Sequence, residues 1–233
     1  MITYPLIEIR ENFYCIEHAM SHDVVRSFFI IGDDYALLID TGLAHQELKE
    51  QLETLTSLPI HVLFTHSDKD HMGDAHRFDH RFMHPDEVSH YLKREECPLS
   101  FIPILENEVI KCGDYQFEVL LIPGHTPGHI ALLESHKRFM IGGDSFQNGP
   151  IFMMGEGRDF EKYLNTLKKI DLIKNDIDVI YASHHSLEFS PNDLILLINA
   201  TQKMINHQLI GQKEELFGRT FIKYQDQSIS FYA

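Results

Sequence analysis

Short apolar segments of this chain repeatedly end in clusters of histidine, aspartate and glycine. The cluster His66–His71 follows Ile60–Phe64, which reads as a buried strand, and it offers four potential metal ligands within six residues. The cluster Pro123–His129 follows the strand-like segment Tyr115–Ile122, and its two Gly and two Pro fix an unusual backbone path. Because the end of a buried strand is a rigid platform, we expect polar side chains placed there to converge.

Two later residues show the same placement. Asp144 follows the strand-like segment Arg138–Ile141, and His184 follows the short segment Val179–Ala182. The chain also holds 16 His among 233 residues, and imidazole and carboxylate groups are common metal ligands. Four strand ends that each carry such a side chain can meet at one edge of the sheets. The sequence therefore predicts a metal site at that edge.

The remaining apolar segments predict an α/β chain with a single domain spanning residues 1–233, without repeats or a linker. Strands and helices alternate twice, which favours two β-sheets packed together with helices outside. Further strands are expected at Leu6–Ile9, Phe13–Ile16, Ser27–Ile31, Tyr35–Ile39, Ile130–Glu134, Phe221–Tyr224 and Ile229–Tyr232. Helices are expected at Leu43–Leu55, Pro85–Lys93, Phe160–Ile173 and Ser190–Asn206.

Charge and composition narrow the functional classes. The formal net charge is −15, and such an acidic surface repels nucleic-acid backbones and anionic lipid, so neither is an expected partner. No apolar run approaches the length of a membrane span, and the charged N-terminus is unlike a signal peptide. Three Cys without a pattern suit a reducing compartment, which predicts a cytoplasmic protein. With nucleic acid and membranes not expected, the predicted partner is a small-molecule substrate. The oligomeric state stays open.

The ordered set H-x-[HD]-x-D-H, P-G-H-T-P-G-H, G-D and a late His resembles the metallo-β-lactamase-fold hydrolase superfamily. The segment Phe28–Gly42, which ends in Leu38-Ile39-Asp40-Thr41-Gly42, is also similar to the hairpin that precedes the first cluster in that family. The resemblance implies an αββα four-layer sandwich with two divalent metal ions at one sheet edge. Carried over, it places His66, Asp68 and His125 on the first ion, Asp70, His71 and His184 on the second, and Asp144 between both.

The family's chemistry implies a metal-bridging hydroxide that attacks a small ester, thioester, lactone or phosphodiester, with Asp70 orienting the hydroxide and taking its proton. Hydroxyacylglutathione hydrolases resemble this chain in the core only. They normally carry a C-terminal helical region with basic glutathione contacts, whereas 49 residues follow His184 here without an equivalent basic set. Glutathione thioesters therefore rank below other small substrates.

Asp68 departs from the family, which usually has His at this position. Three carboxylates and a hydroxide would cancel the charge of two divalent ions, so the cluster should be a weaker Lewis acid. Zinc is the expected ion, while Asp68 leaves iron or manganese open. Two alternatives to the hydrolase follow: an iron-dependent redox enzyme of the persulfide dioxygenase type on the same fold, and a non-catalytic metal-binding domain.

Four further histidines lie near the predicted site. His129 is expected to support the ligands from behind rather than to bind metal. His185 is either a substrate contact or a surface residue. His18 and His22 fall between the first strands, where the family has a loop over the site, and they are candidate substrate contacts or surface residues.

Overall fold

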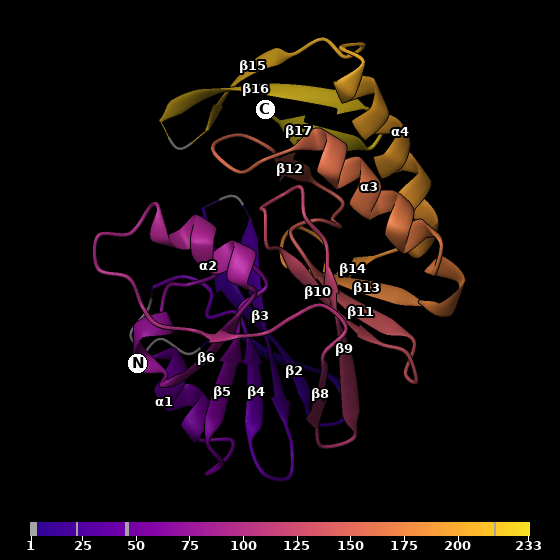
Figure 1. Cartoon of the computed structure of the whole chain (residues 1–233). Helices are drawn as coiled ribbons and strands as arrows, with labels where there is room; N and C mark the ends of the chain where they lie inside the picture. Colours follow the sequence, from indigo (N-terminus) through magenta and orange to yellow (C-terminus); the bar gives the residue numbers. More distant parts are fainter. Residues whose placement is uncertain (1–3, 22, 45–46, 217) are drawn as a thin grey trace.

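Two large β-sheets lie face to face in the structure, a computed structural model that describes residues 4–21, 23–44, 47–216 and 218–233 (Figure 1). The N-terminal sheet has the strand order β1-β2-β3-β4-β5-β6-β7, and the second sheet has the order β14-β13-β11-β10-β9-β8. The first comprises β1 (Leu6–Arg10), β2 (Phe13–Ala19), β3 (Val24–Ile31), β4 (Ala36–Ile39), β5 (Ile60–Leu63), β6 (His80–Met83) and β7 (Ile102–Pro103). The second comprises β8 (Val109–Cys112), β9 (Tyr115–Leu121), β10 (Ile130–Glu134), β11 (Phe139–Gly143), β13 (Val179–Ala182) and β14 (Glu188–Phe189).

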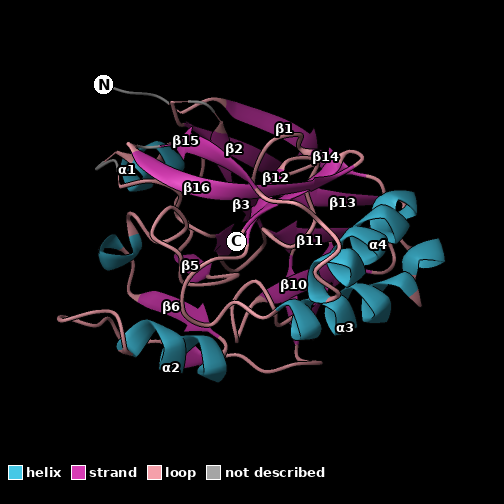
Figure 2. Cartoon of the chain, turned by 90° about the horizontal axis from the view of Figure 1, so that it is seen from above, coloured by secondary structure: helices cyan, strands magenta, loops and turns pink. Residues whose placement is uncertain are grey.

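Helices cover both outer faces. Helices α1 (Leu48–Glu53) and α2 (Pro85–Leu92) lie on the side of the N-terminal sheet, and α3 (Phe160–Asp171) and α4 (Leu194–Ile205) lie on the side of the second sheet (Figures 1 and 2). Short 3-10 turns occupy Ala75–Arg77, Lys174–Asp176 and Pro191–Asp193. The predicted four-layer αββα sandwich is confirmed. Helix α1 is shorter than the expected Leu43–Leu55, of which residues 45–46 lie outside the described part.

The core between the sheets is aromatic. Phe13 and Phe28 of the N-terminal sheet meet Phe139 and Tyr181 of the second sheet, with ring centroids 5.5–6.1 Å apart. All residues of β10 and β11 are buried, because the second sheet is covered by the first on one side and by helices on the other. Double burial explains why these strands appear in the sequence as continuous apolar runs.

A third, four-stranded sheet was not predicted. It has the order β12-β17-β16-β15 and joins β12 (Pro150–Phe152), β15 (Gln212–Leu216), β16 (Arg219–Asp226) and β17 (Ile229–Tyr232). The expected C-terminal hairpin is present as β16 and β17, but β17 also pairs in parallel with β12. Figure 1 shows β15, β16 and β17 above the two large sheets, on the side of their loops. The third sheet is therefore an addition to the two predicted sheets.

Parallel pairing brings the predicted strand ends together. Strands β4 and β5 are parallel, as are β11 and β13, so the loops that follow them leave at the same edge of each sheet. An isolated bridge between Val25 and His184 joins the two sheets there. In the part of the chain that the structure describes, no helix is both long and apolar enough to cross a membrane. The three cysteines are unpaired, with Cys15 and Cys112 buried and Cys97 exposed.

Candidate metal centre

His66, His125 and Asp144 bring ligand atoms within 4.8 Å of one another at this edge, and Asp68 lies beside the two histidines. His66 Nε2 lies 3.5 Å from Asp68 Oδ2 and 3.8 Å from Asp144 Oδ2. His125 Nε2 lies 3.4 Å and 3.6 Å from the same two oxygens. Ligand atoms held tetrahedrally at about 2.1 Å from a zinc ion are about 3.4 Å apart, so the group has the dimensions of a metal site.

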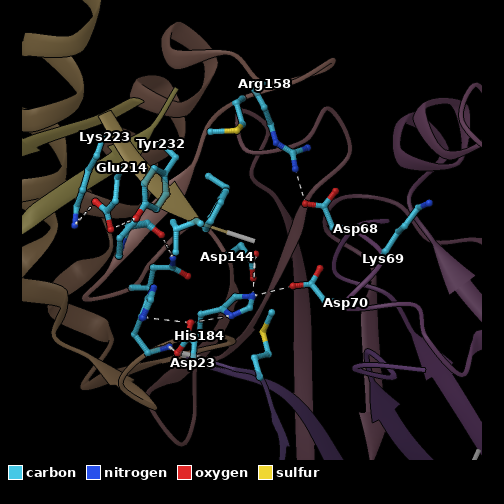
Figure 3. A pocket seen from close by; sticks show the side chains of 17 residues that line it. Asp23, Asp68, Lys69, Asp70, Asp144, Arg158, His184, Glu214, Lys223 and Tyr232 are labelled. Carbon is cyan, nitrogen blue, oxygen red and sulfur yellow. Dashed lines mark hydrogen bonds and ion pairs between the residues drawn. The ribbon is translucent and has the colours of Figure 1, made fainter. Parts of the chain in front are cut away.

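A second group shares the same aspartate. His184 Nε2 lies 3.3 Å from Asp70 Oδ2 and 3.4 Å from Asp144 Oδ2, and His71 Nε2 lies 3.1 Å from Asp144 Oδ1. Figure 3 shows His184 pointing to both Asp70 and Asp144. Asp144 therefore faces both groups, as the family resemblance implies for a ligand that contacts two ions.

Several buried atoms of these groups lack ordinary partners. The Nε2 atoms of His66, His71 and His125 and the Oδ1 atom of Asp144 make no hydrogen bond of ordinary geometry with the described residues, although His71 Nε2 and Asp144 Oδ1 lie 3.1 Å apart. Polar atoms buried without a partner are costly, and native proteins seldom leave several in one place. A cation between the imidazoles and carboxylates satisfies all of them at once, so the residues present fit divalent metal ions.

Asp40 fixes the orientation of two of these histidines. Its Oδ2 accepts a hydrogen bond from His71 Nδ1 at 2.8 Å and another from the Thr65 hydroxyl at 2.7 Å. That hydroxyl uses its one proton to donate to Asp40. Toward His66 Nδ1, which lies 3.0 Å away, it can therefore act only as an acceptor, so Nδ1 carries the proton. With the protons on Nδ1, the Nε2 lone pairs of His66 and His71 face the centre, which is the tautomer a metal ion requires.

His184 follows strand β13 of the second sheet, and residues at the start of β3 in the N-terminal sheet orient its ring. Its Nδ1 donates to the Val24 carbonyl at 2.8 Å, and Asp23 Oδ2 lies 3.3 Å away. Asp23 Oδ2 is also 3.2 Å from Nδ1 of His185, whose backbone N–H donates to Asp23 Oδ1. Burial opposes ionisation of Asp23, but hydrogen bonds from His184 and His185 outweigh it and lower its pKa well below the usual range. One carboxylate thus holds both histidines in place.

The electrostatics of the cluster favour positive charge. Burial disfavours the imidazolium of His71, yet the charges of Asp144 and Asp40 outweigh burial and raise its pKa well above the usual value. Burial likewise opposes charge on His184, and Asp144 raises its pKa in the same way. Protons or metal ions therefore compensate these carboxylates, and metal uptake displaces the protons.

Glu87 of helix α2 connects the two metal-facing loops. Its Oε1 accepts hydrogen bonds from the Ser67 backbone N–H at 2.9 Å and the Ser67 hydroxyl at 2.5 Å. Its Oε2 accepts from the Gly128 N–H at 3.0 Å. Burial disfavours the Glu87 carboxylate, but the charge of His66 and the hydrogen bonds outweigh it, and the pKa of Glu87 is lowered.

Glu87→Ala is expected to lower the free energy of unfolding by about 2–4 kcal/mol near neutral pH, because it leaves buried N–H groups unpaired. The pKa of Glu87 is lower in the folded chain than its usual 4.5, so this contribution is present above that value and is lost as the pH falls below it. Urea unfolding of the metal-free wild type and variant should therefore differ near neutrality and converge in acid. Glu96→Ala, an exposed control, should change little at either pH; a constant difference across this range would contradict the assignment.

His129 lies next to His66 and outside the two ligand groups. It is fully buried, its Nδ1 is 3.0 Å from the Ser145 hydroxyl, and its ring is 4.6 Å from that of His66. Burial, followed by the charges of His66 and His125, lowers the pKa of His129 well below the usual value. A neutral imidazole here packs against His66 without adding charge.

Of the two early histidines, the structure describes only His18, and it differs from its prediction. His18 is a fully buried residue of β2, with its Nε2 3.0 Å from the Ser27 hydroxyl, so it does not reach the cavity at the site. Its ring packs against Gly42, where a Cβ would come within 2.3 Å of Nε2. His18 is thus a core residue rather than a substrate contact. His22 lies outside the described residues.

A cavity of about 480 Å³ opens beside the two ligand groups. His185 lines it, and so do side chains of the third sheet (Figure 3). The other lining residues are Met20, Asp23, Asp68, Lys69, Asp70, Asp144, Gln147, Pro150, Phe152, Met154, Arg158, His184, Glu214, Leu216, Lys223 and Tyr232. The volume suits a small organic molecule.

Sequence reasoning missed four residues that support the site: Asp23, Asp40, Glu87 and Arg158. Asp40 follows an apolar strand and precedes Thr41-Gly42, the same placement that marks the ligands, so this signal could have found it. Glu87 and Arg158 have no such signal, because each acts on a loop distant in the sequence.

Comparison with known proteins identifies the family. The sequence model of the metallo-beta-lactamase superfamily matches residues 21–184. Hydroxyacylglutathione hydrolase GloC of Haemophilus influenzae is 30% identical over 178 residues, covering 67% of this chain and 84% of that protein. A hydroxyacylglutathione hydrolase of Aliivibrio fischeri is 29% identical, covering 66% of this chain and 58% of its own length. An uncharacterized Aquifex aeolicus protein is 30% identical, covering 50% of this chain and 62% of that protein. The chain thus spans less than two thirds of the Aliivibrio fischeri and Aquifex aeolicus proteins.

Solved structures show the same fold at lower identity. A metallo-beta-lactamase from Pontibacter korlensis superposes with a TM-score of 0.73 at 14% identity, covering 86% of this chain and 99% of that one. A metallo-beta-lactamase family protein from Thermus thermophilus gives 0.67 at 16% identity, covering 84% and 81%. The sequence match and the shared architecture agree with each other. The chain therefore belongs to the metallo-beta-lactamase superfamily.

Proposed function

We propose that this chain is a dinuclear metal-dependent hydrolase that acts on a small thioester or a related ester. The observation that carries the proposal is the position of Asp144 between two groups of histidines whose Nε2 atoms face one another. His66, Asp68, His125 and Asp144 would hold one ion, and Asp70, His71, His184 and Asp144 the other. Zinc is the expected metal, with iron or manganese as substitutes.

In the proposed hydrolysis, the residues of the chain itself would have separate roles. Two divalent ions would activate a water molecule as nucleophile and polarise the substrate carbonyl. The Asp70 carboxylate lines the cavity within 3.3 Å of His184 Nε2, where it can orient that water and accept its proton. His185 and Tyr232 border the space left for the substrate.

The names of the relatives favour thioesters over the other candidate substrates. Two of them are named hydroxyacylglutathione hydrolases, although the sequence alone placed glutathione thioesters below other small substrates. The third sheet contributes a cation to the cavity that this ranking did not include. Lys223 Nζ lies 3.3 Å from Glu214 Oε2, and Tyr232 donates to Glu214 Oε1 at 2.9 Å. Glu214 takes one of the three ammonium donors, so Lys223 can also bind an acidic group of the substrate.

The test is a substrate panel run on the zinc-loaded and the chelated protein. It comprises a hydroxyacylglutathione, an N-acetylcysteamine thioester, a lactone, an aryl ester and a phosphodiester. We expect the highest kcat/KM for a thioester and loss of activity on chelation. The proposal fails if the metal-loaded protein hydrolyses none of them. Oxygen consumption with a persulfide, seen only with iron, would instead favour the redox enzyme.

Lys223→Met is expected to raise KM about tenfold for thioesters that carry a carboxylate far from the scissile bond, with kcat nearly unchanged, because one charged hydrogen bond is lost. A neutral thioester should not respond. Steady-state kinetics of both substrates measure the difference, and Lys213→Met, on the exposed edge strand β15, is the matched control. An equal rise in KM for the neutral substrate would contradict a role in charge recognition.

A further inference from the structure

We propose that Arg158 is a built-in counter-ion for Asp68 that restores the positive charge lost when a carboxylate replaces histidine at this ligand position. The inference rests on the proposed metal centre and concerns how the chain tolerates its departure from the family pattern. Arg158 Nη2 donates to Asp68 Oδ2, and Figure 3 shows the guanidinium directed at that carboxylate across the cavity wall.

The same oxygen of Asp68 faces the metal position. Asp68 Oδ2 lies 3.5 Å from His66 Nε2 and 3.4 Å from His125 Nε2. A carboxylate oxygen has two lone pairs, so Oδ2 can accept from Arg158 on one side and face a metal ion on the other. Arg158 therefore orients the ligand atom itself rather than the back of the side chain.

Arg158 is held in place by its surroundings. Its side chain is 9% exposed, and its Nε is buried with no hydrogen-bond partner among the described residues. The next residue, Asp159, caps helix α3 through Glu161 N and Lys162 N, and its own N–H donates to the Gly124 carbonyl at 2.9 Å. A buried guanidinium with a fixed backbone stays beside its carboxylate, unlike a surface arginine that solvent can compete for.

The net charge of the proposed metal centre explains why Asp68 would need a cationic partner. Around two divalent ions, Asp68, Asp70 and Asp144 leave one positive charge uncompensated, whereas histidine at position 68 would leave two. The guanidinium of Arg158 supplies the missing charge. Together, Asp68 and Arg158 therefore match a neutral histidine, and the weaker Lewis acid expected from the sequence alone is not what this site would present.

A second arginine lies nearby but contacts a different atom. Arg94 Nη1 is 3.6 Å from Asp68 Oδ1, and its Nη2 donates to the carbonyl and hydroxyl of Ser67. Arg94 thus pairs with the other oxygen of Asp68 and holds the Ser67 loop, whereas Arg158 touches the oxygen that faces the metal position. This difference makes Arg94→Met a matched control.

The test is the effect of Arg158→Met in two backgrounds, measured on the full chain as zinc affinity by chelator competition and as zinc content. In Asp68→His, the guanidinium has lost its anion and repels the ions, so Arg158→Met should raise zinc affinity by about 10–100-fold. In the wild type, the same change should alter zinc affinity less than about threefold, because loss of repulsion and loss of ligand orientation oppose each other. Arg94→Met should not rescue Asp68→His.

Equal effects of Arg158→Met in both backgrounds would overturn the proposal while leaving the metal centre intact. A wild-type chain that takes up no zinc would overturn both. Arg158→Lys serves if Asp68→His does not fold, because it keeps the charge and loses the planar fork. It should retain zinc affinity and the rate, whereas Arg158→Met should lower kcat/KM about tenfold. Identical behaviour of the two variants in rate would contradict a role for charge.

Discussion

Asp144→Ala is expected to reduce the metal content below one ion per chain and to lower kcat/KM by at least about a thousandfold, because metal ions supply several kcal/mol of transition-state stabilisation. The reason is geometric. Asp144 Oδ2 faces His66, His125 and His184, while Oδ1 faces His71. Its loss removes the one carboxylate that both groups share.

Elemental analysis and kinetics of the same preparation check this result. Asp178→Ala is the matched control, because Asp178 is an exposed aspartate paired with Arg138 on the protein surface. The control should keep its metal and its rate. An Asp144→Ala protein with two ions and wild-type activity would show that Asp144 does not bridge them.

Asp40→Ala should weaken zinc binding about 10–100-fold, as expected when the partner that orients metal-binding histidines is removed. It should also lower the free energy of unfolding of the metal-free chain by about 3–5 kcal/mol, because the donors of Thr65 and His71 lose a buried carboxylate. Urea unfolding and chelator competition measure the two effects separately.

Asp40→Asn separates the carboxylate from the backbone at this position. The φ of Asp40 is +59°, which asparagine tolerates better than alanine. The amide keeps one acceptor oxygen, so part of the stability should return while the zinc affinity stays low. If Asp40→Asn binds zinc as the wild type does, the carboxylate is not what orients His66 and His71.

The sequence predicted the strand ends well, because the information is local there. Each cluster of proposed ligands comes after an apolar segment, and parallel pairing of β4 with β5 and of β11 with β13 then brings those ends together. The alternation of strands and helices predicted two packed sheets with helices outside, and the family resemblance implied the αββα sandwich.

The errors lie where contacts are distant or the pattern is weak. Strand β12 has three residues and β15 reads Gln-Lys-Glu-Glu-Leu, so neither carries a strand-like apolar alternation, and the third sheet went unseen. Arg158 meets Asp68 across 90 residues, a pairing that no local spacing reveals. His18 comes after the predicted strand Phe13–Ile16 and was expected between strands. It is instead part of β2, and its ring packs in the core beside Gly42.

The most direct test of the account is the metal content of the chain, purified without added metal or chelator and then refilled with zinc, together with anomalous diffraction at the zinc edge. We predict two zinc ions per chain, one between His66 and His125 and one between His71 and His184, with Asp144 contacting both. A protein that holds no metal after refilling, or a single ion away from Asp144, would contradict the dinuclear centre on which the proposed hydrolase depends.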